Sequence, residues 1–425
     1  KRGDLSAVVA TASLELGIDV EAVELVCQVE SPGNIARGLQ RVGRAGHVVG
    51  GTGKGGLLAK TPGDLLESAA LCRAMLRGDV EHLRVPTNCL DMLAQQMVAM
   101  VAVERWDVPD LFNLVRCAYP YRDLTAEAFE SVLKLISGRF RGDTFRDLRA
   151  RIVWDPIHNR LAPLPGSSRL ALAGGGAIPD TGQYPVYLGN KGPRLGELDE
   201  EFVFERRVGE AFLLGNATWQ IEAIEPHRVV VRRAEGSQAV VPFWRGENAP
   251  RSPELAQAIG TLSREIRDRL DDPSVIEWLK EECCLDNTSA TRLLSFIRRQ
   301  MQLAGALPDD RTILIESFRD PAGELGLAIL TTFGGKVNHG LKLAIQAKFR
   351  NRFGIVVSCL HADEGVLVRL PRLEEIPFDL FRDLTGERVE ALIREELAES
   401  ALFGLRFRQN AARALLMPRP DPSKR

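Results

Sequence analysis

Short apolar runs alternate with polar turns over the first 60 residues of the chain. The runs at residues 6–11 and 23–29 predict two buried strands, and the amphipathic stretch 34–45 predicts a helix. Strands that flank a helix in this way are typical of an α/β unit with a parallel sheet. Because two strands do not form a stable sheet alone, we expect either that further strands precede residue 1 or that residues 1 to about 60 are unstable by themselves.

The next part of the chain changes to helical periodicity. The mostly apolar residues 90–103 predict one helix, Pro109 opens a second and Thr125 caps a third. The β-like segments 151–156 and 159–164 follow, so the pattern is that of a winged helix, with a generic helical bundle as the alternative. The residues expected to face the core from the second and third helices are Leu111, Leu114, Val115, Phe129, Val132, Leu133 and Ile136.

Between about residues 165 and 250, β-rich runs alternate with turn signals, which indicates a small barrel or sandwich. These runs cover residues 200–207, 210–215, 218–224, 227–234 and 238–244.

Helical periodicity returns at Pro253, which opens a helix, and helices continue to about residue 305. The apolar face of the first of these helices is formed by Leu255, Ile259, Leu262 and Ile266. The last part reads as α+β, with a helix at 337–350 and strands at 311–317, 325–330, 354–360 and 365–370.

Composition narrows the class of protein. The chain of 425 residues has room for roughly three domains, and no apolar run approaches the roughly 18 residues that a membrane span needs. Lys and Arg number 55 against 57 Asp and Glu, so any nucleic-acid site must be a local patch. The seven cysteines are scattered without a C-x-x-C pair, which argues against a disulfide framework and a zinc site and favours a reducing, cytoplasmic setting.

One local basic patch stands out in "NIARGLQRVGRAGH". A helix here places Arg37, Arg41 and Arg44 on one face, and because their charges repel, an anionic partner is expected. An arginine face near the carboxyl edge of a parallel sheet can hold a phosphate and stabilise a transferring phosphoryl group. A solvated basic face is the alternative. Gly43 and Gly46 argue against it, because glycine destabilises a helix by about 1 kcal/mol relative to alanine, so its presence suggests a close approach of the backbone to another group.

A second cluster, "ATASLELGID", follows the first predicted strand. Thr11 and Ser13 offer hydroxyl donors to a phosphate, Gly17 offers its backbone N–H, and Asp19 offers a carboxylate to a ribose or a neighbouring arginine. An ordinary strand-to-helix turn is the alternative. The pairing of the two clusters on adjacent βα units is the more specific signal.

At these residues the chain resembles a known family. "VVATASLELGIDV" looks like motif V and "QRVGRAGH" like motif VI of superfamily 2 helicases, in the spelling of the Lhr (large helicase-related) family. The likeness covers nearly the whole chain. Further stretches that resemble the Lhr core, in the same order, are "LDMLAQQMVA", "LVRCAYPY", "IPDTGQYPVYLG", "GELDEEFVFERRVGEAFLLGNATWQI", "VPFWRGE" and "FGGKVNHGL".

The resemblance implies a multidomain α/β and α+β protein. Residues 1–62 would be the C-terminal part of a second RecA-like domain, and 63–160 a linker and winged helix. An Lhr-specific domain would fill 161–425, β-barrel-like at 165–250, helical at 252–305 and DEAD/H-associated α+β at 306–418. The implied activity is an ATP-dependent 3′-to-5′ DNA helicase of DNA repair, with single-stranded DNA and 3′-tailed duplex as partners, no membrane partner, and repair nucleases or ligases as candidate protein partners.

The resemblance also implies residue roles. Gln40, Arg41 and Arg44 would face ATP as catalytic residues, with Arg44 meeting the γ-phosphate. Gly17 and Asp19 would also bind ATP and, together with Thr11, couple the cleft to the DNA backbone; Thr11 and Ser13 would contact the DNA. The last position of motif VI is often Arg in the superfamily but is His47 here; His47 would also line the ATP site, and the role of that arginine would pass to Arg44.

The sequence departs from a complete helicase in one important respect. It contains no G-x-x-x-x-G-K-[ST] and no D-E-x-H box; in "GGTGKGG", Val48 and Gly55 stand where the first Gly and the Ser/Thr would be. The chain also begins without Met, so we interpret it as starting inside a domain. The Mg²⁺ ligands are therefore expected in a first RecA-like domain outside it, and the chain alone is not expected to hydrolyse ATP.

The remaining candidates are weaker. Trp219 and Trp244 could stack on unpaired bases, and the family uses an aromatic of its barrel domain in this way, although core filling is the common alternative. The third winged-helix helix carries only Lys134 as a basic residue, which argues against major-groove readout and favours a wedge against the strand. Isolated histidines, including His361 beside Asp363 and Glu364, are expected to be structural or on the surface.

Two other classes of function remain open at this point. One is a single-stranded DNA-binding module without motor activity, similar to the winged-helix and barrel modules of DNA glycosylases. The other is an unrelated multidomain scaffold.

Overall fold

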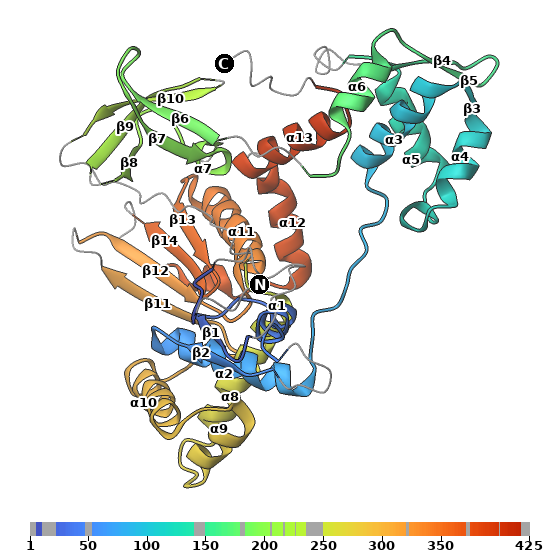
Figure 1. Cartoon of the computed structure of the whole chain (residues 1–425). Coiled ribbons are helices and arrows are strands. Elements are labelled where there is room, and N and C mark those ends of the chain that lie inside the picture. The colour runs from blue at the N-terminus through green and yellow to red at the C-terminus, as the bar shows by residue number, and fades with distance from the viewer. Residues whose placement is uncertain are drawn as a thin grey trace. The chain divides into compact units, whose positions relative to one another are not determined.

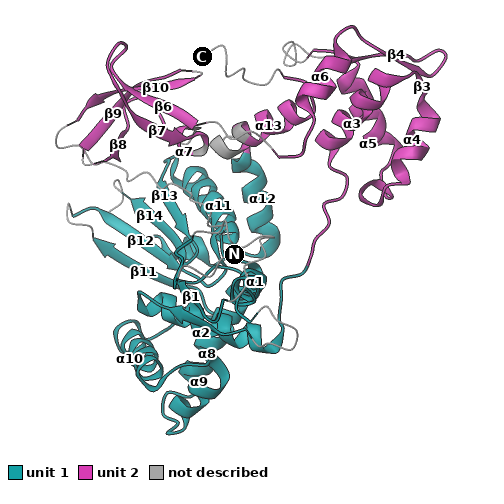
Figure 2. Ribbon diagram, in the orientation of Figure 1, with its two compact units in different colours: residues 1–82, 246–397 teal, residues 83–245, 398–425 magenta. Residues whose placement is uncertain are grey.

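A computed structural model of the chain separates into two compact units (Figure 2). Unit 1 comprises residues 1–82 and 246–397, and unit 2 comprises residues 83–245 and 398–425. The structure describes residues 6–10, 23–46, 53–139, 149–178, 183–204, 206–215, 217–225, 227–234, 250–319, 323–370, 375–398 and 400–417.

Unit 1 contains the predicted small parallel α/β unit, although the strand at residues 55–58 was not predicted. Strands β1 (Val26–Val29) and β2 (Gly55–Leu58) pair in parallel, and α1 (Ile35–Val42) connects them. Helix α2 (Pro62–Arg77) follows; Thr61 caps its start, and Gly78 ends it with a φ of 73° in the left-handed region.

The strand predicted at residues 6–11 is wrong as far as the structure describes it. Residues 6–10 form no strand, and Val9 is fully exposed. A strand persists only when a neighbour satisfies its backbone groups, and β1 and β2 pair with each other and not with this segment.

Three helices from the second half of the chain complete the core of unit 1. They are α8 (Pro253–Asp268), α9 (Val275–Cys283) and α10 (Asn287–Ala304). The predicted apolar face of α8 is buried, and Ser252 caps this helix by accepting the N–H of Leu255. This face packs against α2 in one cluster, which includes Leu66, Ala70, Leu71, Ala74, Leu255, Leu262, Ile266, Leu279, Leu293 and Ile297.

The rest of unit 1 is an antiparallel sheet with two helices. The strands are β11 (Leu314–Arg319), β12 (Leu325–Leu330), β13 (Ser358–Ala362) and β14 (Gly365–Leu370), in the order β11-β12-β14-β13. Helix α11 (Gly335–Phe353) buries Ile345 and Phe349 against the sheet, and its Ala344 and Ala347 pack on Leu392 of α12 (Gly386–Leu397). The predicted strands and helix of this part are confirmed, with shifted bounds; α12 was not predicted.

Unit 2 contains the predicted winged helix (Figure 1). Its helices are α3 (Leu90–Val103), α4 (Val108–Arg116) and α5 (Ala126–Ile136), and its strands β3 (Trp106–Asp107), β4 (Ile152–Asp155) and β5 (Arg160–Pro163) pair in the order β3-β5-β4. Thr125 caps α5 as predicted. The predicted core residues are buried except Leu114, which is exposed because α4 turns Leu111 and Val115 inward instead. Helices α6 (Ser167–Gly174) and α13 (Ala401–Arg413) complete this part of the unit.

The second sheet of unit 2 is a curled half-barrel. Its strands are β6 (Gln183–Leu188), β7 (Arg194–Asp199), β8 (Ala211–Leu214), β9 (Ala217–Glu225) and β10 (Arg228–Arg233), in the order β7-β6-β10-β9-β8. The curl brings the edge strands β7 and β8 together, since a Cβ on Gly196 would lie 3.3 Å from the side chain of Leu214. The predicted strands at 210–215, 218–224 and 227–234 are confirmed, β6 and β7 were missed, and residues 238–244 lie outside the described part.

The strand predicted at 200–207 is wrong. Residues Glu200–Phe204 form the short helix α7. Phe202 and Val203 are adjacent in sequence and both buried, which a strand with alternating faces would not allow. The Phe202 ring packs edge-on against Phe212 of β8, with ring centroids 5.7 Å apart.

Candidate functional site

The predicted arginine patch forms the end of α1 and the turn that follows it. Helix α1 stops at Val42, and residues 43–46 form a turn in which the Arg44 N–H donates to the Arg41 carbonyl at 3.1 Å. Gly46 has a φ of 69° and donates its N–H to the Val23 carbonyl at 3.0 Å. The turn thus needs a glycine at Gly46 and returns the chain to the start of β1.

The expectation that Arg37, Arg41 and Arg44 share one face of one helix is therefore wrong for Arg44. This residue lies past the helix end, where the backbone leaves the 3.6-residue period. We call residues 40–46 the arginine turn. Within it Gln40 is exposed, and Arg41 and Arg44 are half-buried.

Neighbouring groups of the chain itself orient two of the guanidinium groups. Arg41 Nη1 donates to Gln28 Oε1 of β1 at 2.9 Å, and Gln28 is in turn held by a hydrogen bond from its Nε2 to the Val29 carbonyl. Arg37 Nη1 donates to the Pro32 carbonyl at 3.4 Å. The strand end thus fixes the direction of Arg41.

Helix α1 lies directly on α2, because Gly38 allows a close approach. A Cβ at Gly38 would lie 2.9 Å from Met75 Sδ and 3.6 Å from Leu71. On its other side, Val42 covers Gly55 of β2 so closely that a Cβ there would lie 2.5 Å away. The helix is therefore held between α2 and the strands, with the arginine turn at its carboxyl end.

A protein carboxylate occupies the amino end of α1. Asn34 caps the helix, and Glu81 accepts the N–H of Ile35 at 2.6 Å and of Ala36 at 2.9 Å. Burial alone would raise the pKa of Glu81, but these backbone hydrogen bonds and one from the Ser252 hydroxyl outweigh it and lower the pKa. Because the Glu81 carboxylate already accepts the first N–H groups of α1 and places a negative charge at the positive end of the helix dipole, a phosphate is not expected to bind at this end.

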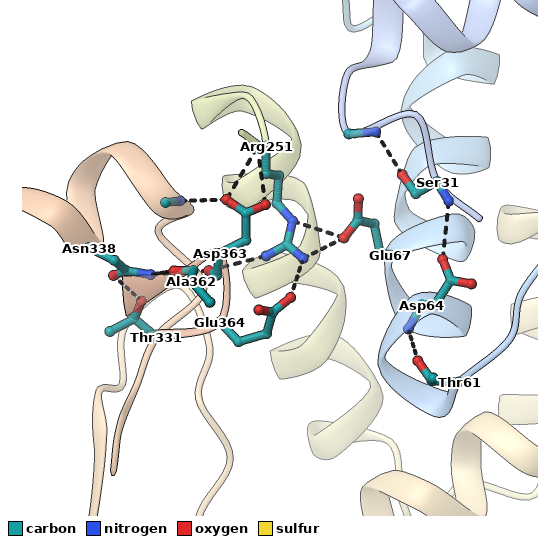
Figure 3. A network of polar contacts seen from close by, with 12 residues as sticks. Ser31, Thr61, Asp64, Glu67, Arg251, Thr331, Asn338, Ala362, Asp363 and Glu364 are labelled. Carbon is teal, nitrogen blue, oxygen red and sulfur yellow. Dashed lines mark hydrogen bonds and ion pairs between the residues drawn. The ribbon is translucent and has the colours of Figure 1, made fainter. Parts of the chain in front are cut away.

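A buried arginine joins α2 to the turn between β13 and β14 (Figure 3). Arg251 donates through Nε to Glu67 at 2.9 Å and also pairs with Glu67 through Nη2, and Nη2 contacts Glu364 at 3.1 Å. Burial alone would lower the pKa of Arg251, but the carboxylates of Glu67, Glu364 and Asp363 outweigh it and raise the pKa. This arginine was not singled out from the sequence, because its partners lie far away along the chain.

The acidic residues beside His361 belong to the same network. Asp363 accepts the N–H of Gly335 at 2.5 Å and that of Arg251 at 3.3 Å, and the buried Asn338 amide donates to the Ala362 and Asp363 carbonyls (Figure 3). Among the described residues, no group of three or more His, Cys, Asp or Glu side chains could hold a metal ion. The acidic residues here thus fasten α11 and Arg251.

Trp219 lies on β9, half-buried at the edge of the half-barrel core. It pairs across the strands with Phe212 and Arg233, and its Nε1–H donates to the Leu214 carbonyl at 3.1 Å. Its ring packs against the core cluster of this sheet. Trp219 therefore has a packing role, while part of its surface remains accessible.

The other predicted site residues have simpler outcomes. Lys134 forms an ion pair with Glu130 at 2.8 Å on α5. Thr11, Ser13, Gly17, Asp19, His47 and Trp244 lie outside the residues that the structure describes. In the part of the chain that is described, no helix is both long and apolar enough to cross a membrane.

Three family models match the chain. Residues 1–48 match the helicase conserved C-terminal domain, residues 73–241 the winged helix domain of the large helicase-related protein, and residues 307–425 the DEAD/H associated domain. The winged helix predicted from the sequence is thereby confirmed.

Individual relatives match along nearly the whole chain. A Mycolicibacterium smegmatis Lhr helicase is 42% identical over 100% of this chain and 28% of its own length. The "Lhr helicase/uracil glycosylase" of Escherichia coli is 39% identical over the same shares, and the "ATP-dependent helicase Lhr-Core protein 2" of Thermococcus barophilus is 30% identical over 99% of this chain and 48% of its own length. The chain thus spans between about a quarter and a half of these relatives.

A solved structure shares the fold. The helicase Lhr of Mycobacterium smegmatis, bound to ssDNA and AMP-PNP, superposes with a TM-score of 0.76 and 37% identity. The likeness covers 97% of this chain and 48% of that one.

Proposed function

Because the chain belongs to the large helicase-related (Lhr) family, we propose that it supplies one wall of the ATP site and the DNA-guiding domains of an ATP-dependent DNA helicase. The observation that carries this proposal is the arginine turn, where Arg41 and Arg44 lie half-buried at the carboxyl end of α1. The amino end of that helix is closed by Glu81, so the cationic surface of this element lies at the turn.

Arg41 and Arg44 of the arginine turn suit contact with one side of a bound triphosphate. Two guanidinium groups at one turn suit phosphate oxygens, and Gln28 holds Arg41 in place. When bound, ATP supplies the phosphoryl group whose transfer drives the motor. In this proposal Arg44 meets the γ-phosphate, Arg41 and Gln40 orient the phosphates, and Gly17, Asp19 and His47 complete this wall. The Mg²⁺ ligands belong to a part of the helicase outside this chain, and the chain alone does not hydrolyse ATP.

We further propose that the DNA partner is single-stranded DNA or a 3′-tailed duplex, on which the helicase moves 3′ to 5′ in DNA repair. The related mycobacterial structure with bound ssDNA supports the choice of strand. Thr11 and Ser13 contact the backbone, and Trp219 contributes its accessible surface to stacking. The free cysteines fit the reducing cytoplasm, and a repair nuclease or ligase would act on the products.

The test of the ATP site is Arg44→Ala in the complete helicase. We expect DNA-dependent ATP hydrolysis to fall by about 10³-fold, as for other arginines that stabilise a transferring phosphoryl group, while single-stranded DNA binding is retained. Arg37→Ala, on α1 just before the arginine turn, is the matched control, because Arg37 donates to the chain's own Pro32 carbonyl. Undiminished hydrolysis in Arg44→Ala would refute the proposal that the arginine turn forms a wall of the ATP site.

The test of the DNA contact is Trp219→Ala, with Trp219→Phe as its control. Base stacking is worth roughly 1 to 3 kcal/mol per base, so we expect Trp219→Ala to lose unwinding while it keeps ATP hydrolysis. Trp219→Phe keeps an aromatic face but loses the hydrogen bond to Leu214. A lower melting temperature in Trp219→Ala, with normal unwinding per folded molecule, would assign Trp219 to the core alone.

A further inference from the structure

Two helices of unit 1 begin at one shared group of atoms. Glu81 accepts the N–H groups of Ile35 and Ala36 in the first turn of α1, and the same carboxylate accepts the Ser252 hydroxyl at 2.8 Å. Ser252 in turn accepts the Leu255 N–H at the start of α8 and donates its own N–H to the Gly33 carbonyl at 3.0 Å. We call Gly33, Glu81 and Ser252 the shared cap.

The shared cap is anchored to the interior of the unit. Arg251 precedes Ser252 and is tied to Glu67 of α2 and to Asp363 and Glu364 of the β13–β14 turn (Figure 3). Arg251 is only 8% exposed, so moving it would separate charges in a poorly hydrated place. The start of α1 is therefore fixed relative to α2, α8 and the β13–β14 turn.

The other end of α1 carries the arginine turn. A helix of eight residues is about 12 Å long and behaves as a short rigid rod. A tilt at its amino end therefore displaces Gln40, Arg41 and Arg44 at its carboxyl end. A displacement of about 1 Å in a catalytic group can lower a rate by about 10²-fold.

We propose that Glu81 is a positioning residue for the arginine turn: through the shared cap it sets the angle of α1 and so the place where Arg41 and Arg44 meet the phosphates. Glu81 acts through α1 and touches no reacting atom. The inference rests on the proposed function, because it assumes that the arginine turn faces ATP. It adds a residue that lies 37 positions after Arg44, between α2 and the segment leading to unit 2.

The test uses the complete helicase with Glu81→Ala and Glu81→Gln. Removing the carboxylate leaves the N–H groups of Ile35 and Ala36 without their acceptor, so we expect kcat for DNA-stimulated ATP hydrolysis to fall at least about tenfold while KM stays within about twofold. Glu81→Gln keeps one acceptor oxygen and is expected to restore most of kcat. Faster amide exchange at Ile35 and Ala36 in Glu81→Ala would show that the helix start has loosened.

Asp286→Ala is the matched control. Asp286 caps α10 by accepting the Ser289 N–H, so its loss lowers stability in a similar way without touching α1. A comparable fall of kcat in Asp286→Ala would show that stability alone is responsible and would overturn the inference. If Glu81→Ala does not fold, Ser252→Ala removes one of the three hydrogen bonds to Glu81, and an unchanged kcat in that variant would overturn it as well.

The outcomes separate the inference from the proposed function. Undiminished hydrolysis in Arg44→Ala overturns both. Loss of hydrolysis in Arg44→Ala together with normal kcat in Glu81→Ala overturns the inference alone. A reduced kcat at unchanged KM in Glu81→Ala, with recovery in Glu81→Gln and a normal Asp286→Ala, supports it.

Discussion

Arg251 holds two carboxylates that differ greatly in exposure, and this difference predicts two very different costs of removal. The side chain of Glu67 is 13% exposed and that of Glu364 is 69% exposed, whereas Arg251 itself is 8% exposed. The perturbation is Glu67→Gln compared with Glu364→Gln. Each removes one charge from the same guanidinium group and keeps the size of the side chain.

The magnitudes follow from the surroundings of each pair. Removing one partner of a buried ion pair costs about 3 to 5 kcal/mol, and we take the lower end for Glu67→Gln because Asp363 and Glu364 remain beside Arg251. An exposed pair contributes about 0 to 1 kcal/mol, which applies to Glu364→Gln. For a folding unit of this size, about 1 kcal/mol shifts the melting temperature by roughly 2 to 4 °C. We therefore expect the melting temperature to fall by roughly 6 to 12 °C in Glu67→Gln and by at most about 4 °C in Glu364→Gln.

Urea unfolding of the 425-residue chain, followed by Trp278 fluorescence, measures both costs. Trp278 lies on α9 and is the single tryptophan of the unit 1 sequence, so the other four would be replaced by phenylalanine in the parent chain. The double variant Arg251→Met/Glu67→Gln should cost less than the sum of its single changes, because no buried charge is then left alone. Equal costs for Glu67→Gln and Glu364→Gln, or strict additivity in the double variant, would refute the assignment of the buried pair.

Three further predictions concern other parts of unit 1. Hydrogen bonds lower the pKa of Glu81, so its contribution to stability is full above the ordinary pKa of 4.5 and is lost as the pH falls through the folded-state pKa. Urea unfolding should therefore show that the stability difference between wild type and Glu81→Gln shrinks as the pH falls below that range. Burial raises the pKa of Cys283 to about 12, whereas Cys284 is exposed. Alkylation at about pH 8 should therefore label Cys284 and spare Cys283, and equal labelling of the two by mass spectrometry would contradict this. A Cβ at Gly260 would lie 2.7 Å from the Asp310 amide nitrogen, so Gly260→Ala should lower stability by about 1 to 3 kcal/mol, and a stabilised variant by calorimetry would disprove the tight approach of α8.

The helices that the sequence predicted well are those whose signals are local. Thr125 and Ser252 stand directly before apolar periodic stretches, and the structure places both as caps of α5 and α8. Within those stretches the 3.6-residue period decides which side chains face the core, so all four residues predicted for the apolar face of α8 are buried.

The errors arise where distant neighbours decide the structure. Residues 6–10 have the composition of a strand but pair with none of the described strands. Phe202 and Val203 form a helix because both side chains are buried in the half-barrel core. The helix predicted at residues 34–45 is present as α1, but it ends at Val42, and the turn that follows depends on the hydrogen bond from Gly46 to Val23. Glu81 carried no local signal, since its partners lie 46 residues before it and 171 residues after it.

The way unit 1 is divided along the chain has a consequence for its synthesis. The apolar face of α2, with Leu71 and Ala74, is covered by Leu255 and Ile266 of α8, which are made roughly 180 residues later. At the usual rates of translation this interval lasts about 10 to 40 s, and unit 2 is not complete within it either, because residues 398–425 of that unit are made last. Newly made α2 therefore keeps its apolar face exposed to solvent until α8 has been synthesised, and such transiently exposed surface makes the nascent chain prone to aggregation.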